Sequence, residues 1–340
     1  MRLAALPDLP SNLVSGLEQC GIRTEADLLF SGSTLDVFRR LPAETTTLKE
    51  LAKLMALVAE AASAPGQSAA ALVEADVESD CNNDFLSGLP QLDQALSGLT
   101  APRRLIEVSG NKGSGKTSLL LRLVLHHLVF RPQSSVLWVD TTVDFSVVRA
   151  GEILDSFGIP GASTALERLQ VCQAFEVDTV FQVLEDMSTW CISHPTKIRA
   201  VVVDSVTSLL GPLLSPVSSQ GHAIMTGFMR QLRVLAQTYC ITVFVVNNSA
   251  AFTPLVPGSA SNNPNIRKPA LGPSFTFMTD ATLWLALCRE TAYAEAGALA
   301  VEETECTKHV VQVYRSKITA SKPLCTFKMR RGIILLETEG

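Results

Sequence analysis

Two hydrophobic patterns divide this chain of 340 residues into parts of different class. Toward the N-terminus, apolar residues such as Leu13 and Leu17, or Leu51 and Val58, recur at the spacing of amphipathic helices. After Phe85, short valine-rich runs alternate with longer helical patterns, which is typical of a mainly parallel α/β sheet. The chain is therefore predicted to hold a small helical unit followed by a larger α/β unit.

The α/β unit is predicted to contain a series of strands with helices between them. Its middle strands are valine-rich and lack polar alternation, as expected when helices cover both faces of a sheet. The predicted strands are 104–109, 135–140, 168–172, 199–204, 241–247, 281–287 and 309–316, and a final hairpin crosses residues 330–332. The predicted helices are 115–129, 146–157, 177–193 and 223–238.

Between the two patterns the chain is rich in small and acidic residues, which indicates a linker. We predict a helical N-terminal domain over residues 1–62, a linker over 63–84 and an α/β domain over 85–340. The length of the chain agrees with two domains.

Composition excludes several classes of protein. Hydrophobic residues make up 47% and charged residues 18% of the chain, so the protein is predicted to be globular rather than disordered. A net charge of −5 is opposite to the basic balance of nonspecific nucleic-acid binders, so any DNA contact must be local or shared with a partner. The eight cysteines form no Cys-x-x-Cys pair, which argues against a zinc or redox site. The uncharged window 234–266 contains prolines, so neither a spanning helix nor a membrane partner is expected.

The most specific motif is GNKGSGKT at 110–117, which matches a P-loop and lies between an apolar strand and an apolar helix. Backbone N–H groups of such a loop and the start of the helix bind phosphate groups, while the lysine supplies a positive charge. The threonine hydroxyl is a ligand for Mg²⁺. The predicted nucleotide-binding residues here are Gly110, Asn111, Lys112, Gly113, Ser114, Gly115, Lys116, Thr117 and Ser118.

A second candidate is Asp204, which ends the buried strand 199–204. A carboxylate at the end of a strand beside the P-loop strand holds the hydration shell of Mg²⁺. Thr117 and Asp204 are therefore the predicted metal-binding residues. The alternative is a strand that ends in aspartate for no functional reason.

These motifs resemble the RecA-type recombinase family over residues 83–337, and FLSGLPQLDQALSG at 85–98 is similar to the segment that precedes the P-loop in that family. The helical unit at 8–62 resembles the N-terminal domain of the eukaryotic members. SVTS at 205–208, KPALG at 268–272 and SFTF at 274–277 are most like the D-type paralogue of the eukaryotic recombinases. The resemblance implies a RecA-like P-loop ATPase core, ATP and Mg²⁺ as cofactors, and a nuclear location.

Departures from the family pattern affect the expected activity. Active members carry Asp-Thr-Glu after the second strand, and its Glu activates water, whereas this chain has Thr142 at that position. A hydroxyl is a poor base near neutral pH, so weak or absent ATP hydrolysis is expected unless Asp144 takes the role. The Arg that packs on adenine is replaced by Ser146, although Arg149 matches a second Arg and is a nucleotide-binding candidate. The sensor Gln of the family aligns with Asn248.

The segments that bind DNA in the family carry little positive charge here. Residues 205–229 contain neither Lys nor Arg, and 249–268 contains only Arg267 and Lys268, at its end. Weak binding of single-stranded DNA by the chain alone is therefore expected. Arg267 and Lys268 are DNA candidates, and a solvated loop boundary is the equal alternative.

Assembly is expected to involve unlike subunits. The linker lacks the Phe-x-x-Ala plug of polymerising members, and 320–322 aligns with their Asp-Ser-Pro segment, which caps ATP on the neighbouring subunit. The implied partners are other recombinase paralogues, the recombinase filament, and single-stranded DNA through the complex.

The hypothesis is an ATP-binding paralogue subunit of a hetero-oligomer that assists homologous-recombination DNA repair by promoting or stabilising the recombinase filament. The sequence leaves open whether the protein is an enzyme. The alternatives are a catalytically active DNA-dependent ATPase that performs strand exchange, a RecA-fold signalling ATPase and a P-loop small-molecule kinase. The kinase would need a lid rich in Arg, and 205–229 and 249–266 together hold no Lys and no Arg.

Overall fold

The fold is described by a computed structural model that covers residues 3, 10–42, 45–63, 68–70, 84–193, 197–215, 219–251, 267–288 and 306–335. It divides into two compact units, Met1–Ser79 and Asp80–Gly340. The division lies inside the segment 63–84, where the sequence predicts a linker. Each unit is considered by itself.

The N-terminal unit consists of four helices in its described part. Three of them begin with a capping box, in which the side chains of Thr24, Ser33 and Thr47 accept from the backbone of an acidic residue three positions later. Buried apolar residues, among them Leu17, Leu28 and Leu51, form a small core, as the three- and four-residue spacing predicts. The helices are α1 (Ser11–Gln19), α2 (Glu25–Phe30), α3 (Thr34–Arg40) and α4 (Leu48–Ala62).

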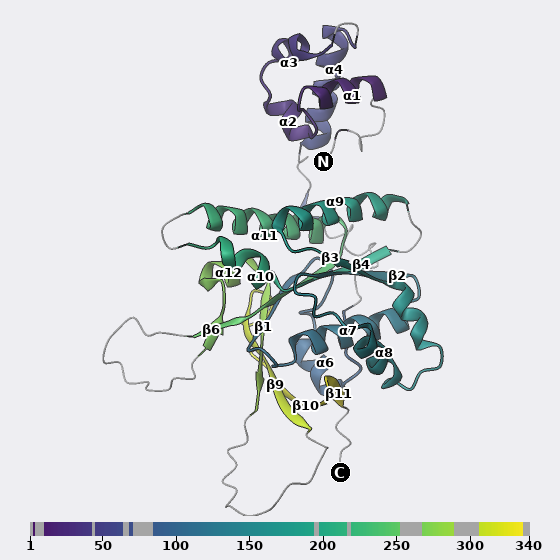
Figure 1. The fold of residues 1–340 in the computed structure, drawn as a ribbon, viewed down its shortest axis with the longest axis vertical. Helices are drawn as coiled ribbons and strands as arrows, with labels where there is room; N and C mark the ends of the chain where they lie inside the picture. Colours follow the sequence, from purple (N-terminus) through teal and green to yellow (C-terminus); the bar gives the residue numbers. More distant parts are fainter. Residues whose placement is uncertain are drawn as a thin grey trace, which may run out of the picture. The chain divides into compact units, whose positions relative to one another are not determined.

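A nine-stranded sheet forms the centre of the second unit in its described part, with strand order β11-β10-β9-β8-β1-β5-β4-β2-β3 (Figure 1). The six strands from β8 to β3 run parallel to one another, and β9, β10 and β11 extend the sheet in antiparallel pairing. The strands are β1 (Leu105–Gly110), β2 (Ser134–Asp140), β3 (Leu169–Gln173), β4 (Lys197–Asp204), β5 (Thr242–Asn247), β8 (Ala281–Leu287), β9 (Thr307–Ser316), β10 (Leu324–Arg330) and β11 (Ile333–Leu335).

Helices cover both faces of this sheet (Figure 1). One face packs against α6 (Pro90–Leu96), α7 (Lys116–Phe130), α8 (Val147–Asp155) and the 3₁₀ helix η2 (Ala162–Arg168). The other face packs against α9 (Val177–Ser193), α10 (Val206–Leu210), α11 (Gln220–Thr238) and α12 (Gly272–Met278).

Strand β2 shows why the strand sequences lack polar alternation. Val136 and Trp138 enter the first apolar cluster, and Leu137 and Val139 enter the second. Both sides of the strand are therefore buried, which requires apolar residues at successive positions. The predicted α/β fold with a mainly parallel sheet and preceding helices is confirmed, and each predicted strand and long helix is present within a few residues.

Several short elements were not predicted. The missed helices are α10, α12 and the 3₁₀ helix η3 (Gly211–Leu213), which have five, seven and three residues. Helices this short show little hydrophobic periodicity. A two-stranded antiparallel sheet joins β6 (Ser249–Ala251) to β7 (Arg267–Pro269). Arg267 and Lys268 therefore belong to a strand, and residues 252–266 lie outside the described residues.

No described helix is both long enough and apolar enough to cross a membrane.

Parallel pairing brings the carboxyl ends of four central strands to one edge of the sheet. Asp140 at the end of β2 is the register partner of Asp204 at the end of β4. Asn247, at the end of β5, is the register partner of Ser109 in β1, the residue before Gly110. Ligands of open parallel sheets bind at this edge, so the residues that end these strands form the candidate site.

Candidate nucleotide-binding site

The predicted P-loop connects β1 directly to α7. Gly110 ends the strand, and a Cβ atom placed on it would lie 2.2 Å from the Leu285 carbonyl oxygen of β8, so no larger residue fits there. Gly115 has φ of +95° and caps the N-terminus of α7. Gly113 has φ of +78°, and a Cβ on it would meet no atom within 4 Å, so that part of the loop borders open space. The loop thus combines left-handed backbone, a helix N-terminus and an open face.

Lys116 lies folded against the loop that precedes it. Its Nζ donates to the backbone oxygens of Gly110 at 3.0 Å and Asn111 at 2.8 Å. The side chain is buried, and burial lowers its pKa, while the nearby Asp204 charge acts in the opposite direction. An ammonium group is therefore held among the loop carbonyls, where phosphate oxygens would provide stronger partners.

The predicted metal ligands contact each other. Thr117 Oγ1 donates to Asp204 Oδ2 at 2.7 Å. The pKa of Asp204 is raised to about 6, mainly by burial and also by the Asp140 and Asp144 carboxylates, although the Thr117 hydrogen bond and the Lys116 charge act to lower it. The carboxylate is thus poorly compensated, and a divalent cation would supply the missing positive charge.

The turn after β2 is organised by Asp140. Its Oδ1 accepts from the backbone N–H of Thr142 at 3.0 Å, and its Oδ2 accepts from the backbone N–H of Phe145 at 3.1 Å. The exposed Thr142 hydroxyl lies 3.4 Å from Asp140 Oδ1. Asp144, the alternative base, is also exposed. The structure therefore places Thr142 in an ordered turn at the same sheet edge as Asp204.

Arg149 and Ser118 approach the turn between β10 and β11. A Cβ on Gly332 in that turn would lie 3.3 Å from Arg149 Nε and 3.4 Å from Ser118 Oγ. Ser118 is in the first turn of α7, and Arg149 is in α8. The C-terminal strands thus lie beside the beginning of the P-loop helix.

A chain of polar contacts connects the DNA candidates to the P-loop. Arg267 Nη1 donates to Ser249 Oγ at 3.2 Å, and Ser249 Oγ donates to the Asn111 side-chain oxygen. Lys268 pairs with Ala250 in the small sheet and is half-buried. The base of the second predicted DNA segment therefore touches the loop that is predicted to bind phosphate.

Asn247 and Asn248 at the end of β5 differ in environment. Asn248, which aligns with the family's sensor residue, is exposed, and its backbone N–H donates to Thr207 Oγ1 at 2.8 Å. Asn247 is fully buried, donates to the Ala270 oxygen at 2.9 Å and accepts from Thr207 Oγ1 at 2.8 Å. Asn247 therefore joins Thr207, in the first predicted DNA segment, to Ala270, two residues after the end of the second.

Glu107 in β1 is a buried acid that the sequence analysis did not single out. Its carboxylate accepts from Asn247 Nδ2 at 2.7 Å and from Thr282 Oγ1 at 2.8 Å. Burial raises its pKa, while these hydrogen bonds, the Thr276 hydroxyl and the Arg315 charge lower it. The only signal in the sequence is one acid within the apolar strand RLIEVS.

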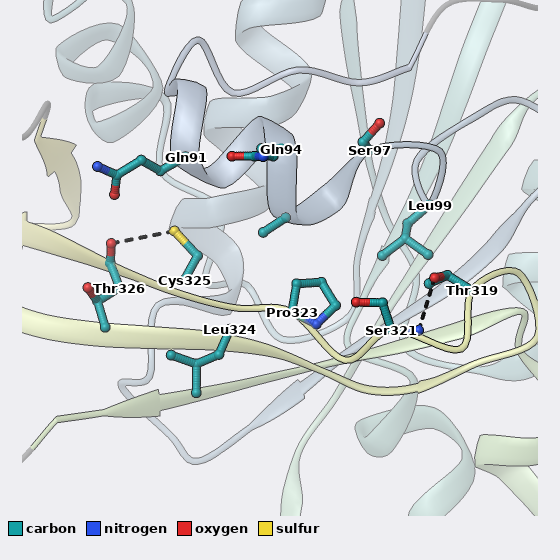
Figure 2. A pocket seen from close by; sticks show the side chains of 11 residues that line it. Gln91, Gln94, Ser97, Leu99, Thr319, Ser321, Pro323, Leu324, Cys325 and Thr326 are labelled. Carbon is teal, nitrogen blue, oxygen red and sulfur yellow. Dashed lines mark hydrogen bonds between the residues drawn. The ribbon is translucent and has the colours of Figure 1, made fainter.

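A separate cavity of about 530 Å³ lies between α6 and β10 (Figure 2). Gln91 and Gln94 of α6 line one side, and Ser321, Leu324 and Thr326 line the other. Ser321 belongs to the segment 320–322 that aligns with the family's ATP cap, and its backbone N–H donates to Thr319 Oγ1 at 3.1 Å. None of the predicted nucleotide-binding residues lines this cavity.

The residues present fit a nucleotide and Mg²⁺. Ser114 Oγ is buried in the P-loop without a hydrogen-bond partner, and the loop face at Gly113 is open. No group of three or more His, Cys, Asp or Glu side chains in the described part of the chain could hold a metal by itself. Mg²⁺ needs no such group, because it binds through one or two protein oxygens, water and substrate phosphates. Thr117 and Asp204 provide that donor set.

Comparison with known proteins agrees with this architecture. Residues 84–312 match the sequence model of the family described as Rad51. The DNA repair protein RAD51 homolog 4 of Bos taurus is 27% identical over 292 residues, which cover 84% of this chain and 84% of that protein. RAD51 homolog 4 of Mus musculus is 28% identical over 205 residues, which cover 58% and 59% of the two chains. The crystal structure of the RadB recombinase is 21% identical with a TM-score of 0.55, and the match covers 74% of this chain and 98% of that chain. The RecA-like fold expected from the sequence is thereby confirmed.

Proposed function

This chain belongs to the Rad51 family, and we propose that it is an ATP-binding subunit of a hetero-oligomeric complex that assists homologous-recombination DNA repair. In this proposal the complex promotes or stabilises the recombinase filament on single-stranded DNA, and the protein acts in the nucleus. The similarity to proteins named for DNA repair over most of the chain supports the biological assignment.

The observation that carries the proposal is the arrangement of Lys116, Thr117 and Asp204 around an open P-loop. Lys116 and the loop N–H groups would hold the phosphates, and Thr117 and Asp204 would hold Mg²⁺ through oxygen atoms and water. Bound ATP with Mg²⁺ supplies negative phosphate charge and a compensating divalent cation. Arg149 is proposed as a further nucleotide contact from α8.

ATP is proposed to act mainly as a structural ligand. The turn after β2 presents the Thr142 hydroxyl where active members of the family carry the carboxylate that activates water. A general base contributes about 10²–10⁴-fold to a rate, so its replacement by a hydroxyl makes turnover slow. Binding of ATP would still stabilise the folded subunit and its interfaces by mass action.

The proposed partners are other recombinase paralogues and the recombinase filament. Single-stranded DNA is proposed to bind weakly or through the complex. The first segment, 205–229, contains neither Lys nor Arg, and the second, 249–268, contains only Arg267 and Lys268, at its end. Because affinity for DNA grows with the number of neutralised phosphates, two cations provide a weak site.

The test is ATP binding and hydrolysis by the purified chain, with and without single-stranded DNA. We expect binding with negligible turnover in the unmodified protein and loss of binding in Lys116→Ala. Lys197→Ala is the matched control, because Lys197 is exposed at the opposite end of β4. Thr142→Glu is expected to raise turnover by about 10²-fold or more, the contribution of a general base.

Two outcomes would redirect the proposal. Brisk DNA-stimulated turnover in the unmodified chain would favour the active strand-exchange enzyme and would require another base, such as Asp144. ATP binding without any recombinase paralogue among the proteins that copurify would favour the signalling ATPase. Equal nucleotide binding by the Lys116→Ala and Lys197→Ala variants would contradict the assignment of the site itself.

A further inference from the structure

His309 connects the C-terminal strands to the P-loop. It lies in β9, is buried, and its Nδ1 is 3.0 Å from the backbone oxygen of Ser114. Its Nε2 is 2.8 Å from Thr307 Oγ1, and its ring stacks on Phe327 of β10 at a centroid distance of 5.6 Å. Three contacts therefore fix the imidazole, and one of them is a loop carbonyl that is predicted to border the phosphates.

The chemistry of these partners assigns the protons. A backbone carbonyl only accepts, so Nδ1 must carry hydrogen and donate to Ser114. In the neutral ring Nε2 accepts from the Thr307 hydroxyl. In the charged ring Nε2 donates to that hydroxyl, which then donates to the Met329 oxygen at 3.1 Å. The bond from Nδ1 to Ser114 is present in both forms.

Holding this carbonyl also orients the next N–H group. Among the peptide bonds of the described residues only Asp204–Ser205 is cis, so the Ser114–Gly115 peptide is trans. In a planar trans peptide the C=O and the following N–H point in opposite directions. With the Ser114 carbonyl directed at β9, the Gly115 N–H is directed away from β9.

The packing around Gly115 shows which side is closed. A Cβ on Gly115 would lie 2.5 Å from Met329 Cε and 3.6 Å from His309 Nδ1, so β9 and β10 close the loop on that side. A phosphate must therefore approach from the opposite side, toward which the Gly115 N–H points. Helix N-termini and glycine-rich loops bind anions through N–H groups oriented in this way.

We propose that His309 is a positioning residue for nucleotide binding, which anchors the Ser114 carbonyl so that the Gly115 N–H faces the phosphate. This inference rests on the proposed ATP-binding function for its nucleotide arm. It goes beyond that function by assigning a residue from a strand far from the P-loop in sequence. In this proposal the Nδ1–H group provides the anchoring hydrogen bond, and the imidazole ring packs against Phe327 without contacting the nucleotide.

Three substitutions distinguish the contribution of Nδ1 from that of Nε2. His309→Asn keeps a donor at the Nδ1 position, His309→Gln keeps one near the Nε2 position, and His309→Phe keeps only the stacked ring. His222→Phe is the control, because His222 is exposed on α11. Thermal unfolding of each full-length variant verifies that it folds.

The nucleotide arm measures the Kd of ATP with Mg²⁺ by calorimetry. We expect His309→Phe and His309→Gln to weaken binding roughly three- to tenfold, the effect of one neutral hydrogen bond, and His309→Asn to stay within about twofold of the unmodified protein. If Asn, Gln and Phe weaken binding equally, or none of them does, the proposal is overturned.

The second arm needs no nucleotide, so it separates this inference from the proposed function. Hydrogen exchange of residues 110–117 is followed in the nucleotide-free protein. Faster exchange in His309→Phe and His309→Gln than in His309→Asn and His222→Phe supports the anchor, even if the unmodified chain fails to bind ATP. Identical exchange in all variants contradicts it.

Discussion

Asp204→Asn tests whether the candidate site is built at the expense of stability. The Asp204 carboxylate is buried, and its main partner is the Thr117 hydroxyl at 2.7 Å. Asparagine has nearly the same shape, and its side-chain oxygen accepts the same hydrogen bond. The substitution therefore removes the charge while it retains the packing and the contact to Thr117.

The magnitude follows from the pKa of Asp204, which burial raises from 3.8 to about 6. One pKa unit corresponds to about 1.4 kcal/mol, so keeping Asp204 ionised in the folded protein costs about 3 kcal/mol at pH 8. The attraction of Lys116 is already contained in this pKa, because it lowers the value. We expect Asp204→Asn to raise the free energy of unfolding by about 3 kcal/mol at pH 8.

The stability that Asp204→Asn gains over the unmodified protein must increase with pH. Below pH 3.8 the carboxyl is protonated in both states of the unmodified protein, so the two proteins should differ little. As pH rises from about 4 to 6, the unfolded chain releases its proton while the folded chain retains it, so the unmodified protein loses stability. Above about pH 6 the difference should remain constant.

Urea unfolding between pH 4.5 and 8, without nucleotide or Mg²⁺, measures this difference directly. Asp144→Asn is the matched control, because it removes the charge of an exposed carboxylate nearby and should change stability by less than about 0.5 kcal/mol. The reasoning is refuted if Asp204→Asn is no more stable than the unmodified protein at pH 8, or if its gain is the same at pH 4.5. The same variant should lose the Mg²⁺ dependence of ATP binding.

Three further outcomes are expected. Gly110→Ala should lower the free energy of unfolding by more than about 2 kcal/mol in urea titrations, because its Cβ would lie 2.2 Å from the Leu285 oxygen, whereas Gly227→Ala in α11 meets no atom within 4 Å and should be neutral or stabilising. Glu107→Leu should cost about 3–5 kcal/mol by the same assay, because Asn247 and Thr282 would keep buried donors without an acceptor, and Glu107→Gln should cost clearly less. Arg267→Ala should weaken the binding of single-stranded DNA to the assembled complex and reduce the salt dependence of the binding constant by the amount expected for about one phosphate contact. If the slope of log K against log salt concentration is unchanged, Arg267 does not belong to the DNA interface.

The long elements could be predicted because each carries its own periodic signal. Helix α7 and strands β1 and β4 have continuous apolar patterns, and the P-loop between β1 and α7 has a fixed spacing of Gly, Lys and Thr. Such signals are local, so one sequence contains them. Thr117 and Asp204 were predicted to share a metal ion, and they lie in contact. The strand that ends in Asp204 was expected beside the P-loop strand, but β5 lies between β1 and β4.

The remaining features depend on which strands are neighbours, and no local pattern encodes that. Glu107, Asn247 and Thr282 meet because β1 lies between β5 and β8. His309 reaches Ser114 because β9 and β10 fold back beside the P-loop, yet in the sequence it is one histidine in a strand. The β6–β7 pairing was missed for the same reason, since each strand has only three residues and they are separated by 252–266.

The electrostatics of the site connect these features to the proposed role of ATP. Burial raises the pKa of Asp204 and lowers that of Lys116, so both groups resist the charged forms that a nucleotide site requires. Phosphate oxygens favour the charged lysine, and Mg²⁺ favours the charged aspartate. Ligand binding therefore relieves a penalty that is already present in the folded chain and stabilises it without any chemical step. Such a site fits the proposed use of ATP as a structural ligand, and Thr142 at the position of the base is consistent with that proposal.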